Sequence, residues 1–323
     1  MKKKIITITG AAGNIAYSLI FRLLSGQIFP ENVSIQLNLL DIPESSKTLK
    51  GVKYEIEDCA FESLHSIITT DSMEVAFGDS DYILLVGAKP RSQGMQRSDL
   101  LLDNANIFKN QGIAINQYCN DSAKIIVVGN PANTNALIVS HYTPKIPPEN
   151  ITSLMRLDQN RAKSIFASKI NVSVPSISRL IVWGNHSATQ FPDINNVQVD
   201  GLDNFDHKYD NDWIREDFIP RVQNRGAEII DYRGKSSAAS AASAVYDHLN
   251  CVVNGSDDWE SMGVISKNPY GISSEIFYSF PLSVDAKNYK IIENIEISDL
   301  SLNYLRTTEK ELIRERDIIK DLL

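Results

Sequence analysis

The sequence is poor in cysteine, and its few cysteines are spaced in a way that excludes two kinds of protein. Its 323 residues include only Cys59, Cys119 and Cys251, and no two of them form a CxxC pair. An odd number of widely spaced cysteines argues against a disulfide framework and against a zinc site, and is typical of a reducing compartment. We therefore expect a cytoplasmic protein that binds no metal.

Long apolar segments and an excess of positive charge are also missing. No stretch approaches the ~18 continuous apolar residues of a membrane span. The lysines at residues 2–4 precede an apolar run that extends only from Ile5 to Thr9, too short for a signal peptide. The net charge of -8 at pH 7 repels nucleic-acid phosphates and anionic lipids. We therefore expect neither nucleic acid nor a membrane among the partners.

The first half of the sequence alternates regularly between strand and helix signals. Runs rich in Val, Ile and Leu, typical of buried strands, occupy residues 4–9, 34–40, 82–86 and 124–128. Segments with helical spacing occupy residues 14–25, 47–60, 100–119 and 132–141. This alternation predicts an α/β fold built on a doubly wound parallel sheet with helices on both faces.

The second half is less regular. Residues 143–148 contain three prolines, and we interpret them as a hinge between two domains, residues 1–148 and 149–323. Helices are expected at 157–170, 218–231, 237–252 and 299–323. Strands are expected near 180–183, 262–265 and 277–280. The small residues of 236–244 are open to two interpretations, because they could line a pocket or only allow close helix packing.

A glycine-rich turn follows the first predicted strand. It consists of Gly10, Ala11, Ala12, Gly13, Asn14, Ile15 and Ala16. A dinucleotide pyrophosphate needs close backbone approach and free amides at a helix N-terminus. Gly10 allows the tight turn, Gly13 removes a blocking side chain, and Ala16 permits close packing. The spacing is GxxGxxA and not GxGxxG, so an ordinary strand-helix turn remains the alternative.

Asp41 ends the second predicted strand. A carboxylate there accepts hydrogen bonds from ribose hydroxyls and repels a 2′-phosphate, which favours NAD over NADP. Its distance from the glycines exceeds the usual ~20 residues, and we attribute the excess to the loop at residues 26–32. The alternative is an aspartate that opens a turn before Pro43.

Three further segments carry candidate chemistry. Residues 87–99 follow a buried strand and contain Arg91 and Arg97. We interpret them as a lid that closes over an anion, and a solvated surface loop is the alternative. Asp158 and Arg161 are three residues apart on one helix face, a spacing that a surface ion pair would also have. His186 follows a predicted strand in a Gly/Asn turn, although a lone histidine is more often structural.

These signals gain weight as a set. Hydride transfer from an alcohol needs a nicotinamide, a base for the hydroxyl proton and cations for substrate carboxylates. The sequence offers one candidate for each in separate loops that could converge. We assign structural or surface roles to the remaining histidines, which are His65, His141, His207 and His248.

Several stretches resemble the malate dehydrogenases, most closely the cytosolic type. They are GAAGNIAYSLIFRL, EIEDCA, PRSQGMQRSDLL, IFKNQG, IVVGNPANTN, RLDQNRAK, IVWGNHSATQFPD, FIPRVQNRGAEII, SMGVIS and YSFP. They appear in family order from the first strand to about Pro281, and the match beyond that is loose. The resemblance implies a Rossmann domain that binds NAD, followed by a mixed α/β substrate domain, usually in a homodimer.

The resemblance also implies roles for individual residues. His186 looks like the catalytic base and Asp158 like its partner. Arg91, Arg97 and Arg161 look like the arginines that bind a small dicarboxylic acid such as malate. Asn130 resembles the asparagine that touches both cofactor and substrate. The residues that resemble cofactor contacts are Gly10, Ala11, Ala12, Gly13, Asn14, Ile15, Ala16, Asp41, Asn104, Gln111 and Val128.

Four residues depart from the family pattern beside these positions, namely Ser92, Gln93, Gln96 and Gln159. The family commonly has His or a similar residue where Gln159 stands. The departures put loop kinetics in doubt and not the reaction.

The sequence leaves three alternative functions to be weighed against a malate dehydrogenase. A lactate-type dehydrogenase is disfavoured by Arg91, where those enzymes usually carry a neutral residue. A metal-assisted, NAD-dependent glycosidase would need a Cys/His metal pair near the site, which Cys59 and Cys119 do not offer. A non-catalytic NAD-binding protein would keep the glycines but could lose the base or the arginines.

Overall fold

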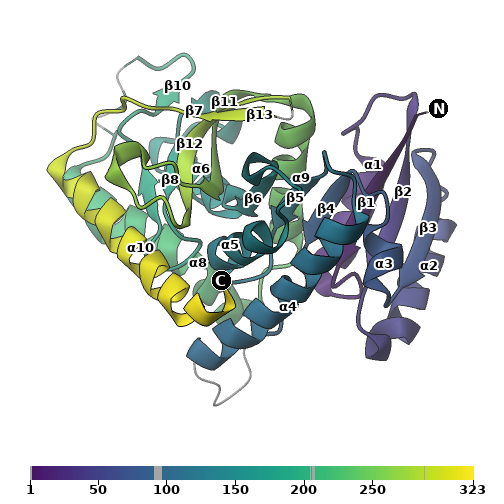
Figure 1. Ribbon diagram of the computed structural model, residues 1–323. Coiled ribbons are helices and arrows are strands. Elements are labelled where there is room, and N and C mark those ends of the chain that lie inside the picture. The colour runs from purple at the N-terminus through teal and green to yellow at the C-terminus, as the bar shows by residue number, and fades with distance from the viewer. Residues whose placement is uncertain (1, 91–96, 204, 206–207, 287) are drawn as a thin grey trace.

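One large sheet runs through the whole molecule (Figure 1). The computed structural model describes residues 2–90, 97–203, 205, 208–286 and 288–323. In these residues the sheet has nine strands in the order β13-β12-β11-β6-β5-β4-β1-β2-β3. The parallel strands are β1 (Lys2–Thr9), β2 (Val33–Leu40), β3 (Leu64–Thr70), β4 (Tyr82–Leu85), β5 (Lys124–Val127) and β6 (Ile151–Leu154).

The sheet continues beyond β6 with antiparallel strands. They are β11 (Ser256–Ile265), β12 (Phe277–Asp285) and β13 (Asn288–Ile291). Two small antiparallel pairs lie outside it, β7 (Ile177–Ser178) with β10 (Gln198–Val199) and β8 (Ile181–Trp183) with β9 (Phe191–Asp193). The strand order reverses between β1 and β4, so their carboxyl ends border the crevice where such sheets bind ligands.

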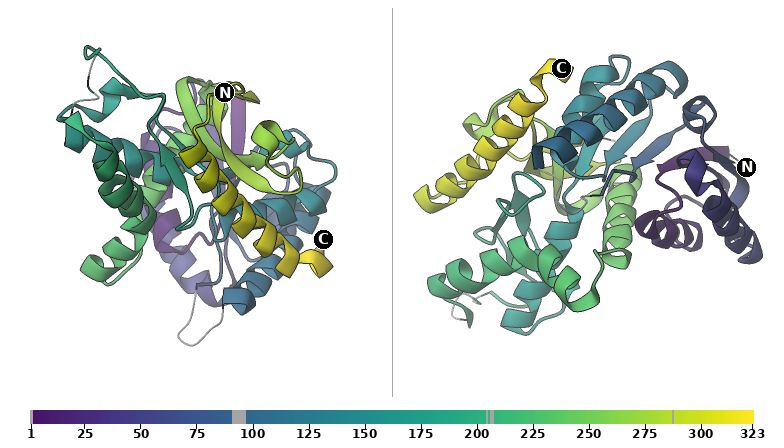
Figure 2. Two further views of the ribbon diagram at one scale, coloured as in Figure 1. Left: turned by 90° about the vertical axis from the view of Figure 1, so that its left-hand side faces the viewer. Right: turned by 90° about the horizontal axis from the view of Figure 1, so that it is seen from below.

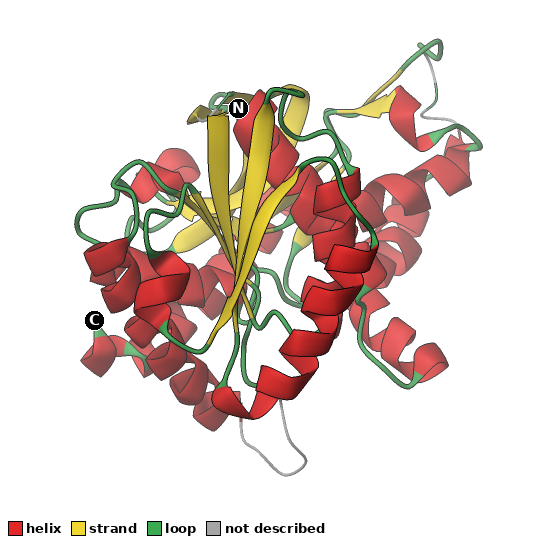
Figure 3. Cartoon of the chain, turned by 90° about the vertical axis from the view of Figure 1, so that its right-hand side faces the viewer, coloured by secondary structure: helices red, strands yellow, loops and turns green. Residues whose placement is uncertain are grey.

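Helices cover both faces of the sheet (Figure 3). The described α-helices are α1 (Asn14–Ser25), α2 (Ser46–Asp58), α3 (Met73–Phe77), α4 (Arg97–Tyr118), α5 (Ala132–Tyr142), α6 (Arg156–Ile170), α7 (Asn211–Trp213), α8 (Ile219–Arg233), α9 (Ala239–Asn254) and α10 (Asp299–Ile318). Ser298 caps the N-terminus of α10, and its hydroxyl accepts from the Ser301 amide. It packs against α5, β9 and β12 at one end of the molecule (Figure 2).

The two faces of the sheet have separate apolar cores. Ile83 and Leu85 of β4 belong to the core under α3, α4 and α5, whereas Tyr82 and Leu84 belong to the core with α1 and α9. Alternate residues of a strand point to opposite faces, so a continuous apolar run is required where both faces are covered. The expected α/β fold with a doubly wound parallel sheet is thereby confirmed.

Some elements were missing from the sequence prediction. The strand β3 and the short helix α3 were not predicted, and neither was β6, which begins only three residues after the proline-rich segment 143–148. Strands from both predicted domains share the one sheet, and the division at residue 148 stays a prediction. In the part of the chain that the structure describes, no helix is long and apolar enough to cross a bilayer.

Candidate active site

The glycine-rich turn joins β1 to α1 at the switch point of the sheet. Gly10 has a φ of 63°, and a side chain there would place its Cβ 2.5 Å from the Cα of Gly87, which follows β4. A Cβ at Gly13 would lie 3.0 Å from the Gly10 carbonyl oxygen. Gly13 caps α1 without any side chain over the helix end. The first amides of α1 are thus open to an anionic group such as a pyrophosphate.

Asp41 lies directly beside this turn. One carboxylate oxygen accepts from the Ala12 amide at 2.8 Å and the other from the Ile42 amide at 2.8 Å. The carboxylate borders a cavity of about 570 Å³. Its lining includes Thr9, Gly10, Leu40, Ile42, Met73, Gly87, Lys89, Ile107 and Gln111. A volume of this order suits a large organic ligand.

Gln111 provides an independent sign that this cavity takes a ligand. The residue is only 6% exposed and lines the cavity, yet its side-chain oxygen has no hydrogen-bond partner among the described residues. A buried, unpaired carbonyl is costly, so a donor on a bound molecule is the natural partner. The cradle at Gly10 and Gly87, the carboxylate of Asp41 and this oxygen fit a dinucleotide.

Three other predicted contacts lie around the ends of β4 and β5. Asn104 is fully buried; its Oδ1 accepts from the Lys89 amide at 2.7 Å and its Nδ2 donates to the Lys89 carbonyl at 3.2 Å. It therefore holds the backbone of the first residues of the predicted lid. Val128 is buried after β5, and Asn130 is exposed before a cis peptide bond to Pro131. Ligand contacts by these three residues stay predictions.

The structure brings Asp158, Arg161 and His186 together. Asp158 lies on α6 and is fully buried. One of its carboxylate oxygens pairs with Nδ1 of His186, which stands in the turn after β8. The other accepts from Nη1 of Arg161 at 3.2 Å. A single carboxylate thus orients both the imidazole and the guanidinium.

The charge state of Asp158 determines which nitrogen of His186 carries the proton. Burial acts to raise the pKa of Asp158, but the neighbouring charges of His186 and Arg161 and the hydrogen bonds from His186 and Gln190 outweigh it, so the pKa is lowered. An ionised carboxylate only accepts hydrogen bonds, so Nδ1 is the donor. Neutral His186 then carries its lone pair on Nε2, the form that a general base requires.

Arg161 has one side of its guanidinium available. Nη2 contacts the Ser237 hydroxyl at 3.3 Å, and Nε is buried with no partner in the described structure. Because Nη1 is engaged by Asp158, the Nε–Nη2 edge is the one that could hold a carboxylate with two hydrogen bonds. Ser237 belongs to the small-residue run whose role the sequence left open, and its contact places that segment at the site.

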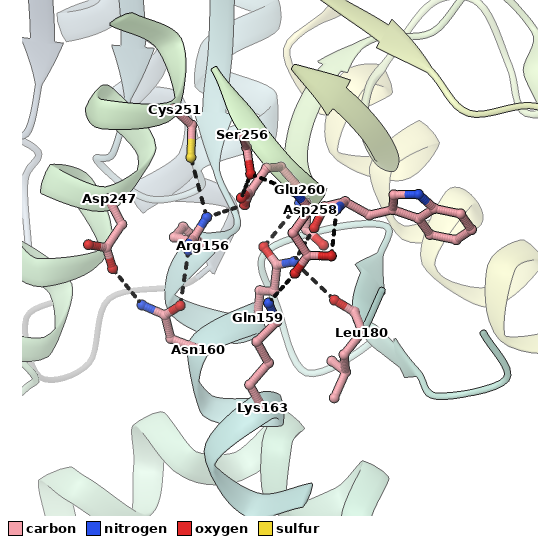
Figure 4. Close-up of polar contacts among 12 residues, drawn as sticks. Arg156, Gln159, Asn160, Lys163, Leu180, Asp247, Cys251, Ser256, Asp258 and Glu260 are labelled. Atoms are coloured by element: carbon pink, nitrogen blue, oxygen red, sulfur yellow. Dashed lines mark hydrogen bonds and ion pairs between the residues drawn. The ribbon is translucent and has the colours of Figure 1, made fainter. Parts of the chain in front are cut away.

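The opposite side of α6 is fixed by a partly buried polar network (Figure 4). Arg156 pairs with Glu260 of β11 and donates to Asn160 at 3.0 Å. Lys163 pairs with Asp258 at 2.6 Å. These residues are spaced three or four apart, so they share one face of α6, while Asp158 and Arg161 lie on another. The network therefore fixes the rotation of the helix that carries the site.

Sequence reasoning did not identify Asn133 of α5. Its Oδ1 accepts from the His186 amide at 3.1 Å, and its Nδ2 donates to the Gly184 and Phe277 carbonyls at 3.2 Å each. Asn133 stands inside the stretch IVVGNPANTN that carries the family resemblance. No local sequence pattern predicts this contact, because Asn133 and His186 are 53 residues apart in the chain.

The remaining candidates are placed only in part. Arg91, Ser92, Gln93 and Gln96 lie outside the described residues. Arg97 is the first residue of α4, and its side chain is not described. The lid that binds substrate therefore stays a prediction. Among the residues that are described, no cluster of three or more His, Cys, Asp or Glu side chains could hold a metal ion.

Comparison with known proteins decides the family. Residues 4–152 match the family model of the lactate/malate dehydrogenase NAD binding domain, and residues 155–322 match that of the alpha/beta C-terminal domain. The chain belongs to the lactate/malate dehydrogenase family. Its N-terminal half is an NAD-binding domain, and NAD is its cofactor.

Solved structures of both kinds of enzyme resemble this member of the family. A malate dehydrogenase from Naegleria fowleri is 45% identical with a TM-score of 0.98, over 100% of this chain and 99% of that one. A Trichomonas vaginalis lactate dehydrogenase in complex with NADH and oxamate is 34% identical with a TM-score of 0.94, over 99% and 98%. A Plasmodium falciparum malate dehydrogenase shares the fold at 22% identity and a TM-score of 0.84, over 100% and 99%.

Proposed function

We propose that the chain is an NAD-dependent malate dehydrogenase that interconverts (S)-malate and oxaloacetate. The observation that carries the proposal is that one carboxylate, that of Asp158, contacts both His186 and Arg161. It thereby orients a base and an arginine that could bind a substrate carboxylate. The 45% identity to the Naegleria fowleri malate dehydrogenase supports malate as the first substrate to test.

The described residues support the following steps. The Nε–Nη2 edge of Arg161 binds the carboxylate next to C2. Nε2 of His186 takes the proton from the hydroxyl oxygen on C2. Asp158 stabilises the imidazolium that forms and keeps Nδ1 as the donor. Bound NAD supplies the acceptor for the hydride that leaves C2.

From the family resemblance we infer that Arg91, on the predicted lid, binds the distal carboxylate of malate. A second guanidinium is what distinguishes a dicarboxylate site from a monocarboxylate site, since an unpaired carboxylate in a closed site is costly. Arg97 would polarise the C2 oxygen in the same closed state. Both roles are inferred from the sequence.

A lactate-type dehydrogenase is the second candidate, because the Trichomonas vaginalis lactate dehydrogenase is 34% identical over nearly the whole chain. The test is a spectrophotometric assay of NADH oxidation with oxaloacetate and with pyruvate. We expect kcat/KM for oxaloacetate to exceed that for pyruvate by at least ~100-fold, the discrimination that a site built around a second charged partner achieves. A preference for pyruvate would replace malate by lactate as the substrate.

We further propose that the enzyme works in the cytoplasm as a homodimer. The resemblance to cytosolic malate dehydrogenases supports both statements. Sedimentation of the purified protein tests the second, and twice the mass of 36.0 kDa is expected.

A further inference from the structure

The turn that carries His186 is attached to the C-terminal helix α10. The Asn185 amide donates to the Thr308 hydroxyl at 2.8 Å, and the Thr189 hydroxyl lies 3.0 Å from the same oxygen. Gly184 has a φ of 96°, and a Cβ there would lie 2.2 Å from the Thr308 side chain. The backbone on either side of the base is therefore packed directly on one fully buried threonine.

A carboxylate one turn further along α10 holds the same segment. Oε2 of Glu311 accepts from the Ser187 hydroxyl, from the Thr189 hydroxyl at 2.6 Å and from Nδ2 of Asn185 at 3.1 Å. Hydrogen bonds to an ionised acceptor are shorter and about twice as strong as neutral ones. The residues before and after His186 are thus tied to the same charged group.

On the other side, Asn133 holds the His186 amide from α5. The turn is therefore held between α5 and α10, and the imidazole extends from it toward Asp158 on α6. Neither Thr308 nor Glu311 lines the nucleotide cavity. Their hydrogen bonds constrain the backbone from which the base projects.

We propose that Thr308 and Glu311 are positioning residues for the catalytic histidine, so that α10 takes part in catalysis without touching substrate or cofactor. The inference rests on the proposed function, in which His186 is the base. A displacement of about 1 Å at a reacting group is enough to cost ~100-fold in rate. Loss of these hydrogen bonds is therefore expected to lower kcat far more than it changes binding.

The first test compares Thr308→Val with Thr308→Ser. Valine keeps the shape of threonine but leaves the buried Asn185 amide without an acceptor, whereas serine retains the hydroxyl. We expect Thr308→Val to lower kcat for malate by ~10- to 100-fold, with the Kd of NADH and the KM of malate within about twofold of wild type. Thr308→Ser should restore most of the turnover.

The second test separates positioning from a loss of folded enzyme. The primary isotope effect with 2-deuterated malate should rise in Thr308→Val and in Glu311→Gln, because a misplaced base slows the chemical step. A smaller folded fraction would lower kcat and leave the isotope effect unchanged. If Thr308→Val does not fold, the isotope effect of Glu311→Gln alone tests the proposal.

A matched control is available on the same helix. Glu309 is buried, accepts from the Ser273 amide at 2.7 Å and pairs with Arg306 at 2.9 Å, away from the histidine turn. Glu309→Gln should lower the melting temperature while its kcat and isotope effect stay at the wild-type values.

The outcomes are distinguishable. A wild-type chain inactive towards both malate and lactate would overturn the proposed function and this inference with it. An active wild type whose Thr308→Val and Glu311→Gln variants show an unchanged isotope effect would overturn the inference alone. So would an equal loss of turnover in Glu309→Gln.

Discussion

His248 of α9 should make the protein sensitive to mild acid. Its side chain is fully buried, its Nε2 lies 2.9 Å from the Thr152 hydroxyl, and its Nδ1 has no partner among the described residues. Burial and the nearby positive charge of Arg156 lower its pKa from 6.5 to about 3. The folded protein therefore keeps this imidazole neutral where an unfolded chain would protonate it.

The size of the effect follows from this difference in pKa. Between pH 6.5 and pH 3 the unfolded chain binds a proton that the folded chain refuses, so the free energy of unfolding falls as the pH falls through this window. One pKa unit corresponds to about 1.4 kcal/mol, so lowering the pH from 7 to 5 should cost about 2 kcal/mol through His248 alone.

The assay is urea unfolding at pH 7 and pH 5 for wild type, His248→Gln and the exposed control His65→Gln. Glutamine keeps a neutral nitrogen that can bond Thr152 but does not titrate. His248→Gln should lose about 2 kcal/mol less than wild type between the two pH values, and His65→Gln should behave as wild type. Equal losses in all three proteins would refute the reasoning.

Three further predictions concern the site. His186→Ala should lower kcat by ~100-fold or more while NADH binding, followed by fluorescence titration, is retained; weak NADH binding would count against its role as the base. Gly10→Ala should weaken NADH binding strongly, because the new Cβ would lie 2.5 Å from Gly87 in a left-handed backbone conformation, and an unchanged Kd would place the cofactor elsewhere. Arg91→Gln should shift preference from malate toward lactate in paired assays, and a constant ratio of the two kcat/KM values would remove Arg91 from substrate binding.

The sequence predicted those strands that contain a run of Ile, Leu or Val residues. The buried positions of β4 and β5 are all hydrophobic, whereas β1 and β2 also bury Thr7, Thr9, Ser34 and Asn38 beside their aliphatic residues. The observed bounds of these four strands lie within about two residues of the expected ones. The strand β3 reads LHSIITT and is half-buried along its length, so it lacks a continuous apolar run. The strand β6 is as short as β4 and β5, but the polar residues Thr152 and Ser153 interrupt its apolar pattern. Strands without an apolar run depend on their neighbours in the sheet, which a local pattern does not contain.

The contacts within the candidate site also differ in how far they could be predicted from the sequence. Asp158 and Arg161 could be paired from sequence because three residues separate them on one helix. The residues that hold the histidine turn could not, since Asn133 is 53 residues from His186 and Thr308 is 123 residues from Asn185. The family resemblance also weakens after Pro281, and α10, which contacts the histidine turn, lies in that part of the chain. Tertiary packing alone brings these groups together.

The departure at Gln159 lies next to Asp158 in the chain, but its side chain faces away from the candidate site. Adjacent helical residues point about 100° apart, so Asp158 faces the site while Gln159 faces β8 and β11. Its Nε2 donates to the Leu180 carbonyl at 2.9 Å (Figure 4). The same Nε2 donates to the Trp259 carbonyl at 2.8 Å, and Oε1 accepts from the Ser261 amide at 3.1 Å. An imidazole has two ring nitrogens and could satisfy at most two of these three backbone groups. Glutamine at this position therefore connects α6 to β11 and to Leu180, the residue just before β8.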